Sequence, residues 1–165
     1  MPAIIAGAFG ANVLPVTAAK SSVPPATATR MLAVGESYGC VVTCQGREPA
    51  STEEWSLFLE AAARHMETTT RPRLLVVTAG GAPSPEQRKK FDQISEKHRA
   101  GLKIAIVTDS TFARGVVRAI RLFYPFYQAF ALSELDEALR FLGVRSVDVL
   151  VIKRFAEELR ASLSG

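Results

Sequence analysis

The sequence has few of the side chains that catalysis uses most often. Its 165 residues include only two cysteines and two histidines. It contains no phosphate-binding loop, no dinucleotide fingerprint and no His-Glu-x-x-His zinc motif. Asp109 follows a predicted strand, and Glu53 and Glu54 lie on a predicted helix. None of these carboxylates has an evident partner for acid–base catalysis. We therefore expect a binding protein and not an enzyme, with no metal and no cofactor.

The two cysteines are too far apart to pair with each other. On one strand, Cys40 and Cys44 would share a face at a separation of about 13 Å, given about 3.3 Å per residue. A disulfide needs Cα atoms within about 7 Å. His65 and His98 have no metal-ligand spacing to the cysteines or to each other. We expect two reduced, buried thiols, as is typical of a cytoplasmic protein.

Charge and hydropathy argue against nucleic acid and against stable membrane insertion. The net charge is +4, and residues 1–30 contribute Lys20 and Arg30 without any acid, which leaves 18 basic and 16 acidic residues. Nucleic-acid binding would call for a clustered basic excess. No apolar stretch approaches the length of a membrane span.

The first thirty residues differ in composition from the rest. They are rich in Ala, Thr, Ser and Pro and show no helical or strand periodicity. Their apolar stretch begins at Ala3 with no basic residue before it, whereas a secretory signal would have one. We predict a flexible tail at 1–30 and one folded domain at 31–165.

Strand and helix patterns alternate from Met31 onward. Ser51 and Glu54 form one predicted capping box, and Ser84 and Gln87 form another. Asp109 or Ser110, the segment 133–136, and Ser146 or Asp148 are predicted to cap the later helices. The segment 149–152 also has the composition of a strand. The apolar residues from Val149 to Leu163 recur at helical spacing, however, so we favour a helix. The predicted strands are 31–36, 39–45, 73–78, 102–108 and 127–131. The first predicted helix follows Ser51 and ends near 68–70, and the other predicted helices are 85–99, 111–123, 133–142 and 147–163.

Two of these strands are apolar without alternation. This pattern, at 73–78 and 102–108, indicates strands that are covered on both faces and lie side by side in the middle of one sheet. The predicted fold class is α/β, with one parallel or mixed sheet and about five helices on both of its faces.

Several short motifs occur in an order that is typical of a known family. They are Leu74–Thr78, Pro83–Arg88, Ile104–Ser110, Ala113–Val117, Ala129–Phe130 and Ser133–Leu139. Together they resemble the STAS/SEC14-like family, also described as SpoIIAA-like, over about residues 31–142. The resemblance implies a mixed sheet of four to five strands packed with helices, and a non-enzymatic, regulatory or protein-binding role.

The resemblance implies two alternative functions. Anti-sigma-factor antagonists of the STAS type are switched by phosphorylation of a Ser in an Asp-Ser-Ser-Gly-type sequence after the central strand. The matching place, 79–84, lacks that sequence, and Ser84 is its nearest hydroxyl. The SEC14 side implies carriage of a lipid or other apolar ligand. The aromatics of 123–130 and the helix 133–142 would then line a cavity.

The candidate site lies in the loops after the two apolar strands. Ligands of open α/β sheets bind at the carboxyl ends of strands, where helix N-termini present unpaired N–H groups. In the next helix, Arg114, Arg118 and Arg121 lie on one side. This side could bind an acidic partner or an anionic headgroup, or it could simply face solvent. Both a monomer and a dimer are compatible with the sequence. The candidate ligand, partner or phosphorylation residues are Gly80, Gly81, Ser84, Asp109, Ser110 and Thr111.

Overall fold

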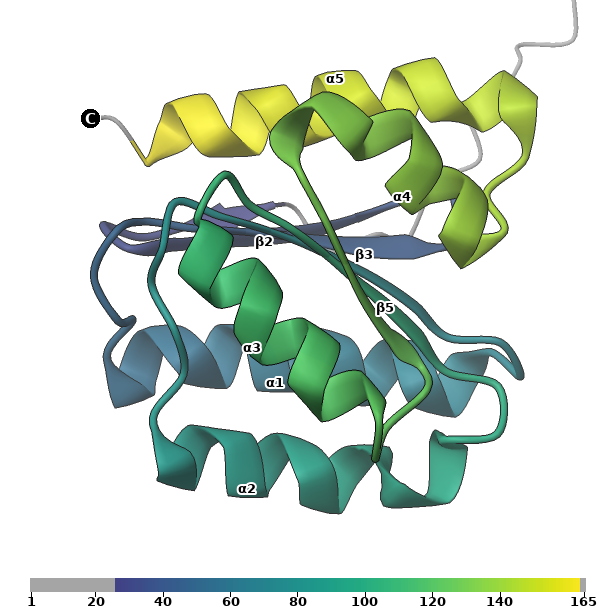
Figure 1. Cartoon of the computed structure of the whole chain (residues 1–165). Helices are drawn as coiled ribbons and strands as arrows, with labels where there is room; N and C mark the ends of the chain where they lie inside the picture. The colour runs from purple at the N-terminus through teal and green to yellow at the C-terminus, as the bar shows by residue number, and fades with distance from the viewer. Residues whose placement is uncertain (1–25, 164–165) are drawn as a thin grey trace, which may run out of the picture.

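A computed structural model describes residues 26–163 (Figure 1). The strands are β1 (Thr27–Ala28), β2 (Leu32–Ser37), β3 (Cys40–Gln45), β4 (Arg73–Thr78), β5 (Lys103–Val107) and β6 (Tyr127–Phe130). The helices are α1 (Thr52–Thr68), α2 (Pro85–Ser95), α3 (Thr111–Arg121), α4 (Leu135–Leu142) and α5 (Ser146–Ser162), with 3-10 turns η1 (Glu96–His98) and η2 (Leu132–Glu134).

The strands form one mixed sheet in the order of the chain, β1-β2-β3-β4-β5-β6. The pairs β1–β2 and β2–β3 are antiparallel, and β3 to β6 are parallel. The predicted α/β class with five helices is confirmed. The sheet has one strand more than predicted, because β1 lies inside the stretch that we predicted as a tail. The rest of that prediction, at 1–25, lies outside the described residues.

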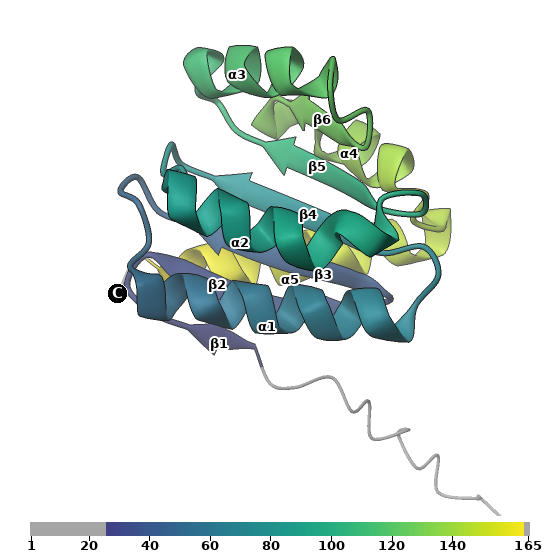
Figure 2. The ribbon, with the colours of Figure 1, turned by 90° about the horizontal axis from the view of Figure 1, so that it is seen from below.

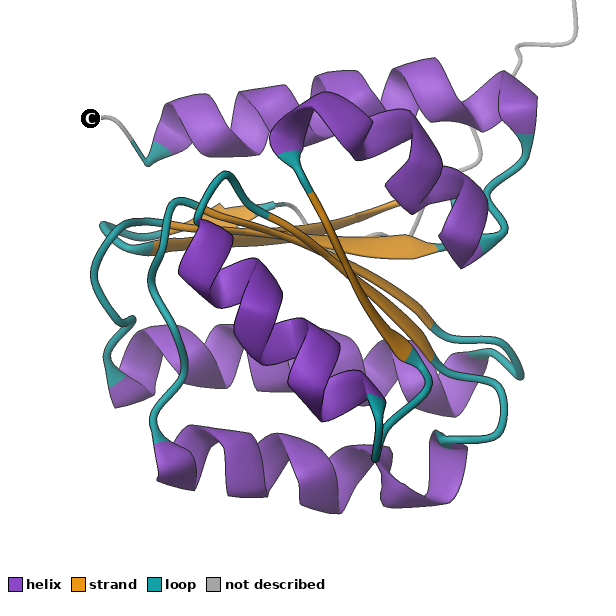
Figure 3. Cartoon of the chain, viewed as in Figure 1, coloured by secondary structure: helices purple, strands orange, loops and turns teal. Residues whose placement is uncertain are grey.

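Helices cover both faces of the sheet. α1, α2 and α3 lie on one face, and α4 and α5 lie on the other (Figures 2 and 3). The parallel strands follow one another in order, so each right-handed crossover advances in the same direction and places its helix on the same side. After β6 the chain crosses to the bare face, where α4 packs against β4, β5 and β6 and α5 packs against β2 and β3.

The central strands are buried from both sides, as their apolar sequences predict. In β4, Leu74 and Val76 belong to the core under α1 and α2, whereas Leu75 and Val77 belong to the core under α4 and α5. β4 and β5 are hydrogen-bonded neighbours in parallel register. The prediction that these two strands lie side by side is therefore confirmed.

Three helix caps are confirmed and two are wrong. Ser51 and Ser84 form capping boxes, and Ser110 accepts a hydrogen bond from the N–H of Ala113. No side chain of 133–136 caps α4, because the turn η2 precedes this helix and the Glu134 carboxylate instead accepts the N–H of Ala131. Neither Ser146 nor Asp148 caps α5. Ser146 is already the first helical residue, and Asp148 binds the Arg145 guanidinium at 2.7 Å.

A buried histidine joins α1 to two strands. His65 is 2% exposed, and its Nδ1 lies 3.1 Å from Oε1 of Glu36 on β2. Its Nε2 accepts the backbone N–H of Arg73 at 3.2 Å, so the ring proton is on Nδ1 and is donated to Glu36. Burial holds the pKa of His65 below its ordinary value, although the Glu36 carboxylate opposes this shift.

We expect the free energy of unfolding to decrease as the pH falls below about 6.5, the ordinary pKa of histidine. The unfolded chain takes up a proton there that the folded chain resists, so stability is lost by up to about 1.4 kcal/mol per pH unit. Urea unfolding between pH 5 and 7.5 measures this decrease. His65→Gln should remove it, whereas His98→Gln, which leaves the Glu36–His65–Arg73 contacts intact, should not. An unchanged slope in His65→Gln would contradict the assignment.

Candidate functional site

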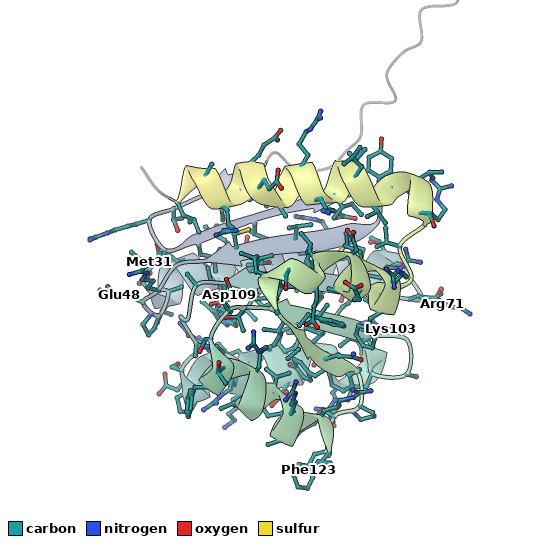
Figure 4. The ribbon with its side chains drawn as sticks, turned by 45° about the horizontal axis from the view of Figure 1, so that its top comes forward. Met31, Glu48, Arg71, Lys103, Asp109 and Phe123 are labelled. Atoms are coloured by element: carbon teal, nitrogen blue, oxygen red, sulfur yellow. The ribbon has the colours of Figure 1, made fainter. Side chains whose placement is uncertain are left out.

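The carboxyl ends of the parallel strands meet along one edge of the molecule. The loops after β3, β4 and β5 lie at this edge, together with the N-terminal caps of α1, α2 and α3. In Figure 4, Met31, Glu48 and Asp109 lie toward this edge, and Arg71 and Lys103 lie at the opposite one. The predicted position of the candidate loops is therefore the observed one.

The loop after β4 is held to the loop after β3 by its glycines. The N–H of Gly81 donates to the carbonyl of Gly46, and the N–H of Gly80 donates to Oγ1 of Thr78. Gly80 has a φ of +133°, which favours glycine. Both N–H groups thus bind within the protein, and the Gly-Gly pair connects two loops.

The serine hydroxyls of the predicted site accept hydrogen bonds from backbone N–H groups nearby in the sequence. Ser84 is exposed, and its Oγ accepts the N–H of Gln87 at 3.2 Å. Ser110 accepts the N–H of Ala113 and donates its own N–H to Oγ1 of Thr108. Thr111 is the exposed first residue of α3. Both serines therefore serve as helix caps, and their hydroxyls lie at helix N-termini.

A pocket of about 560 Å³ opens at this same edge. Of the predicted residues only Asp109 lines it, and its Oδ1 accepts the N–H of Leu132 at 3.2 Å. Thr78, the last residue of β4, and Thr108, which follows β5, also contribute. The remaining polar residues were not predicted from the sequence, because they come from distant segments and form no motif. These are Arg30, Gln45, Arg47, Glu48 and Arg160.

The predicted basic face of α3 is divided by the structure. Arg114 binds back to the sheet through a 3.1 Å hydrogen bond from Nη1 to the carbonyl of Thr108. Arg118 and Arg121 instead line a second pocket, of about 500 Å³, between α3 and α4 beside the edge strand β6. Glu134, Glu137 and Arg140 also line it, and the last two form an ion pair at 3.5 Å.

The same helix exposes large apolar side chains to solvent. We define the α3 apolar face as Phe112 and Val116 of α3 together with Leu122 and Phe123 of the turn that follows it; Phe112 is 82% and Phe123 80% exposed. Val117 is the only residue of α3 that is fully buried. The sequence analysis grouped Phe123 with the neighbouring aromatics, but Tyr124, Phe126 and Tyr127 pack against one another, and Phe130 packs against Phe141.

Both thiols are poor nucleophiles. Cys40 and Cys44 are free and buried, as predicted, and burial raises the pKa of each to about 12. Within residues 26–163, no group of three or more His, Cys, Asp or Glu side chains is placed to hold a metal ion. None of the helices in the described part of the chain is long and apolar enough to cross a membrane.

Comparisons of the chain with protein families, with curated proteins and with solved structures found no match. The resemblance to the STAS/SEC14-like family therefore stays a prediction.

Gly81 and Gly115 make a matched pair of substitutions. A Cβ at Gly81 would lie 2.5 Å from the carbonyl oxygen of Glu48 and 2.8 Å from that of Gly46, whereas a Cβ at Gly115 would meet nothing within 4 Å. Gly81→Ala should lower the free energy of unfolding by about 1 to 3 kcal/mol. Gly115→Ala, in the middle of α3, should raise it by about 0.5 to 1 kcal/mol. Chemical denaturation measures both, and equal effects would contradict the close contact of the two loops.

Proposed function

We propose that this chain is a non-enzymatic, regulatory protein-interaction module of the STAS type, which binds an acidic, partly apolar surface of another protein through α3. The observation that carries the proposal is the α3 apolar face. Solvent exposure of two phenylalanines and a leucine, on α3 and the turn that follows it, is unfavourable unless another surface covers them. A STAS-type regulator must have such a contact surface for its partner.

The charge around α3 supports an acidic partner. Residues 110–133 contain three arginines and no Asp or Glu. Arg118 and Arg121 are exposed and line the pocket between α3 and α4, together with Glu134 and Glu137. Aromatic and arginine side chains dominate the binding energy of many protein interfaces, because the ring buries a large area and the guanidinium binds carboxylates.

The alternative, carriage of an apolar ligand, has less support from the arrangement of side chains. The aromatics that would line its cavity are in contact with one another, at ring-centroid distances of 4.9 to 6.5 Å. The exposed Phe123 stands apart from this group, at the end of α3 (Figure 4). The proposed contact also needs no phosphorylated residue, because the hydroxyls of Ser84 and Ser110 already act as caps.

Site-specific photo-crosslinking in the native cells tests the proposal. A benzoylphenylalanine replaces Phe123 in one variant and Leu150 in the other. Leu150 is a suitable control because it is 69% exposed and lies on α5, on the opposite face. We expect one protein to be captured from position 123 and not from position 150.

The purified partner then gives the quantitative test. Phe123→Ala and Arg118→Glu should each weaken its binding by about tenfold or more, as expected for interface anchors, and Leu150→Ala should not. Identical capture from both positions, or unchanged affinity in both α3 variants, would contradict the proposal. Sedimentation of the chain with phosphatidylserine vesicles, abolished by Phe123→Ala, would assign the face to a lipid surface instead.

A further inference from the structure

The pocket at the carboxyl edge is built from six segments of the chain. Arg30 and Met31 precede β2, residues 45–48 and 77–79 follow the ends of β3 and β4, Thr108 and Asp109 follow β5, Leu132 follows β6, and Arg160 and Leu163 come from the end of α5. No residue of α3 lines it. It is therefore separate from the α3 apolar face, and an inference about it does not depend on the proposed function.

Three arginines surround this pocket. We define the rim arginines as Arg30, Arg47 and Arg160. All three are exposed, and none forms an ion pair with any residue that the structure describes. They come from three different segments, so their arrangement is not the side of one solvated helix. Guanidinium groups that converge without carboxylate partners are a common means of binding an oxyanion.

Two carboxylates and a helix end also face the pocket. Asp109 and Glu48 line it, and one oxygen of Asp109 is occupied by the N–H of Leu132. The C-terminal carbonyls of α5 add partial negative charge, which Arg160 in the last turn offsets. The side chains that line the pocket thus carry one positive charge in excess, so an anion is favoured over a cation.

A largely buried glutamine adds uncharged donors to the pocket. Gln45 is only 8% exposed and lines the pocket, yet its side-chain amide makes no hydrogen bond to any described residue. The amide atoms are not fully buried, so the N–H donors of Gln45 are accessible from the pocket. A ligand oxygen would satisfy its N–H donors.

We propose that this pocket binds a small organic anion, whose phosphate or carboxylate group is held by the rim arginines and by the amide of Gln45. The other part of the ligand packs against apolar side chains of the same pocket. Met31, Val77, Leu132 and Leu163 supply this surface. A site of a few polar groups with an apolar wall is typical of small-molecule binding.

Three probes with one ring and different head groups test this proposal. Phenyl phosphate, benzoate and benzyl alcohol are titrated into the ¹⁵N-labelled full chain at constant ionic strength. We expect phenyl phosphate or benzoate to bind about tenfold more tightly than benzyl alcohol, as a charge-assisted contact would give, and to shift the signals of Gln45, Asp109 and Leu132. The stronger of the two anions identifies the head group. Equal binding of all three probes would overturn the proposal.

Variants separate this site from nonspecific charge effects. Arg160→Gln and Arg47→Gln should each weaken binding of the preferred anion by about tenfold, and Gln45→Glu by more. Arg154→Gln is the matched control, because Arg154 lies on the same helix as Arg160, is exposed and does not line the pocket. Asp109→Asn should strengthen binding, because it removes a like charge. Circular dichroism confirms that each variant is folded. Equal losses in Arg154→Gln and Arg160→Gln, or no loss in both pocket arginine variants, would overturn the proposal.

Discussion

The structure depends on the burial of its central strands from both sides. In β3, β4 and β5, neighbouring residues point to opposite faces, and apolar side chains fill both. A strand of this composition is stable only where two helical layers exclude water from it. The consecutive crossovers supply one layer, and α4 and α5 supply the other. The core therefore leaves little freedom for a binding site within the body of the domain, and polar chemistry is confined to edges and outer helices.

Two surfaces outside the core differ in chemical character. At the carboxyl edge, Thr78 is the last residue of β4 and Thr108 directly follows β5, and each accepts the backbone N–H of the residue two positions later. These turns hold the loops in place, and the pocket forms beside them with polar groups from both halves of the chain. α3 is different, because only one of its residues is fully buried. It carries exposed apolar and basic side chains, whereas the pocket has the size of a small ligand.

Features that depend on neighbouring residues could be predicted from the sequence. Both ends of the strand 73–78 were predicted correctly, because a proline precedes this apolar run and a glycine pair follows it. The capping boxes at Ser51 and Ser84 could be predicted because their hydrogen bonds join residues three positions apart. Features that depend on contacts between distant segments could not be predicted from the sequence. The pocket residues Arg30, Gln45 and Arg160 meet only after folding. Phe112, Val116 and Phe123 have the spacing of a core-facing stripe, which predicts burial. Their exposure could be recognised only from the structure, in which no described element covers them.

The packing of α5 has a consequence for synthesis of the protein. This helix is translated after every strand, yet it covers the hairpin of β2 and β3, the first long strands of the sheet. The contact from Sγ of Cys44 to the carbonyl of Ala156 joins residues that are 112 positions apart. On the ribosome, one face of this hairpin stays open to water until α5 leaves the exit tunnel. During that interval two thiols are accessible to oxidants, and the nascent sheet has an apolar surface that a chaperone would recognise.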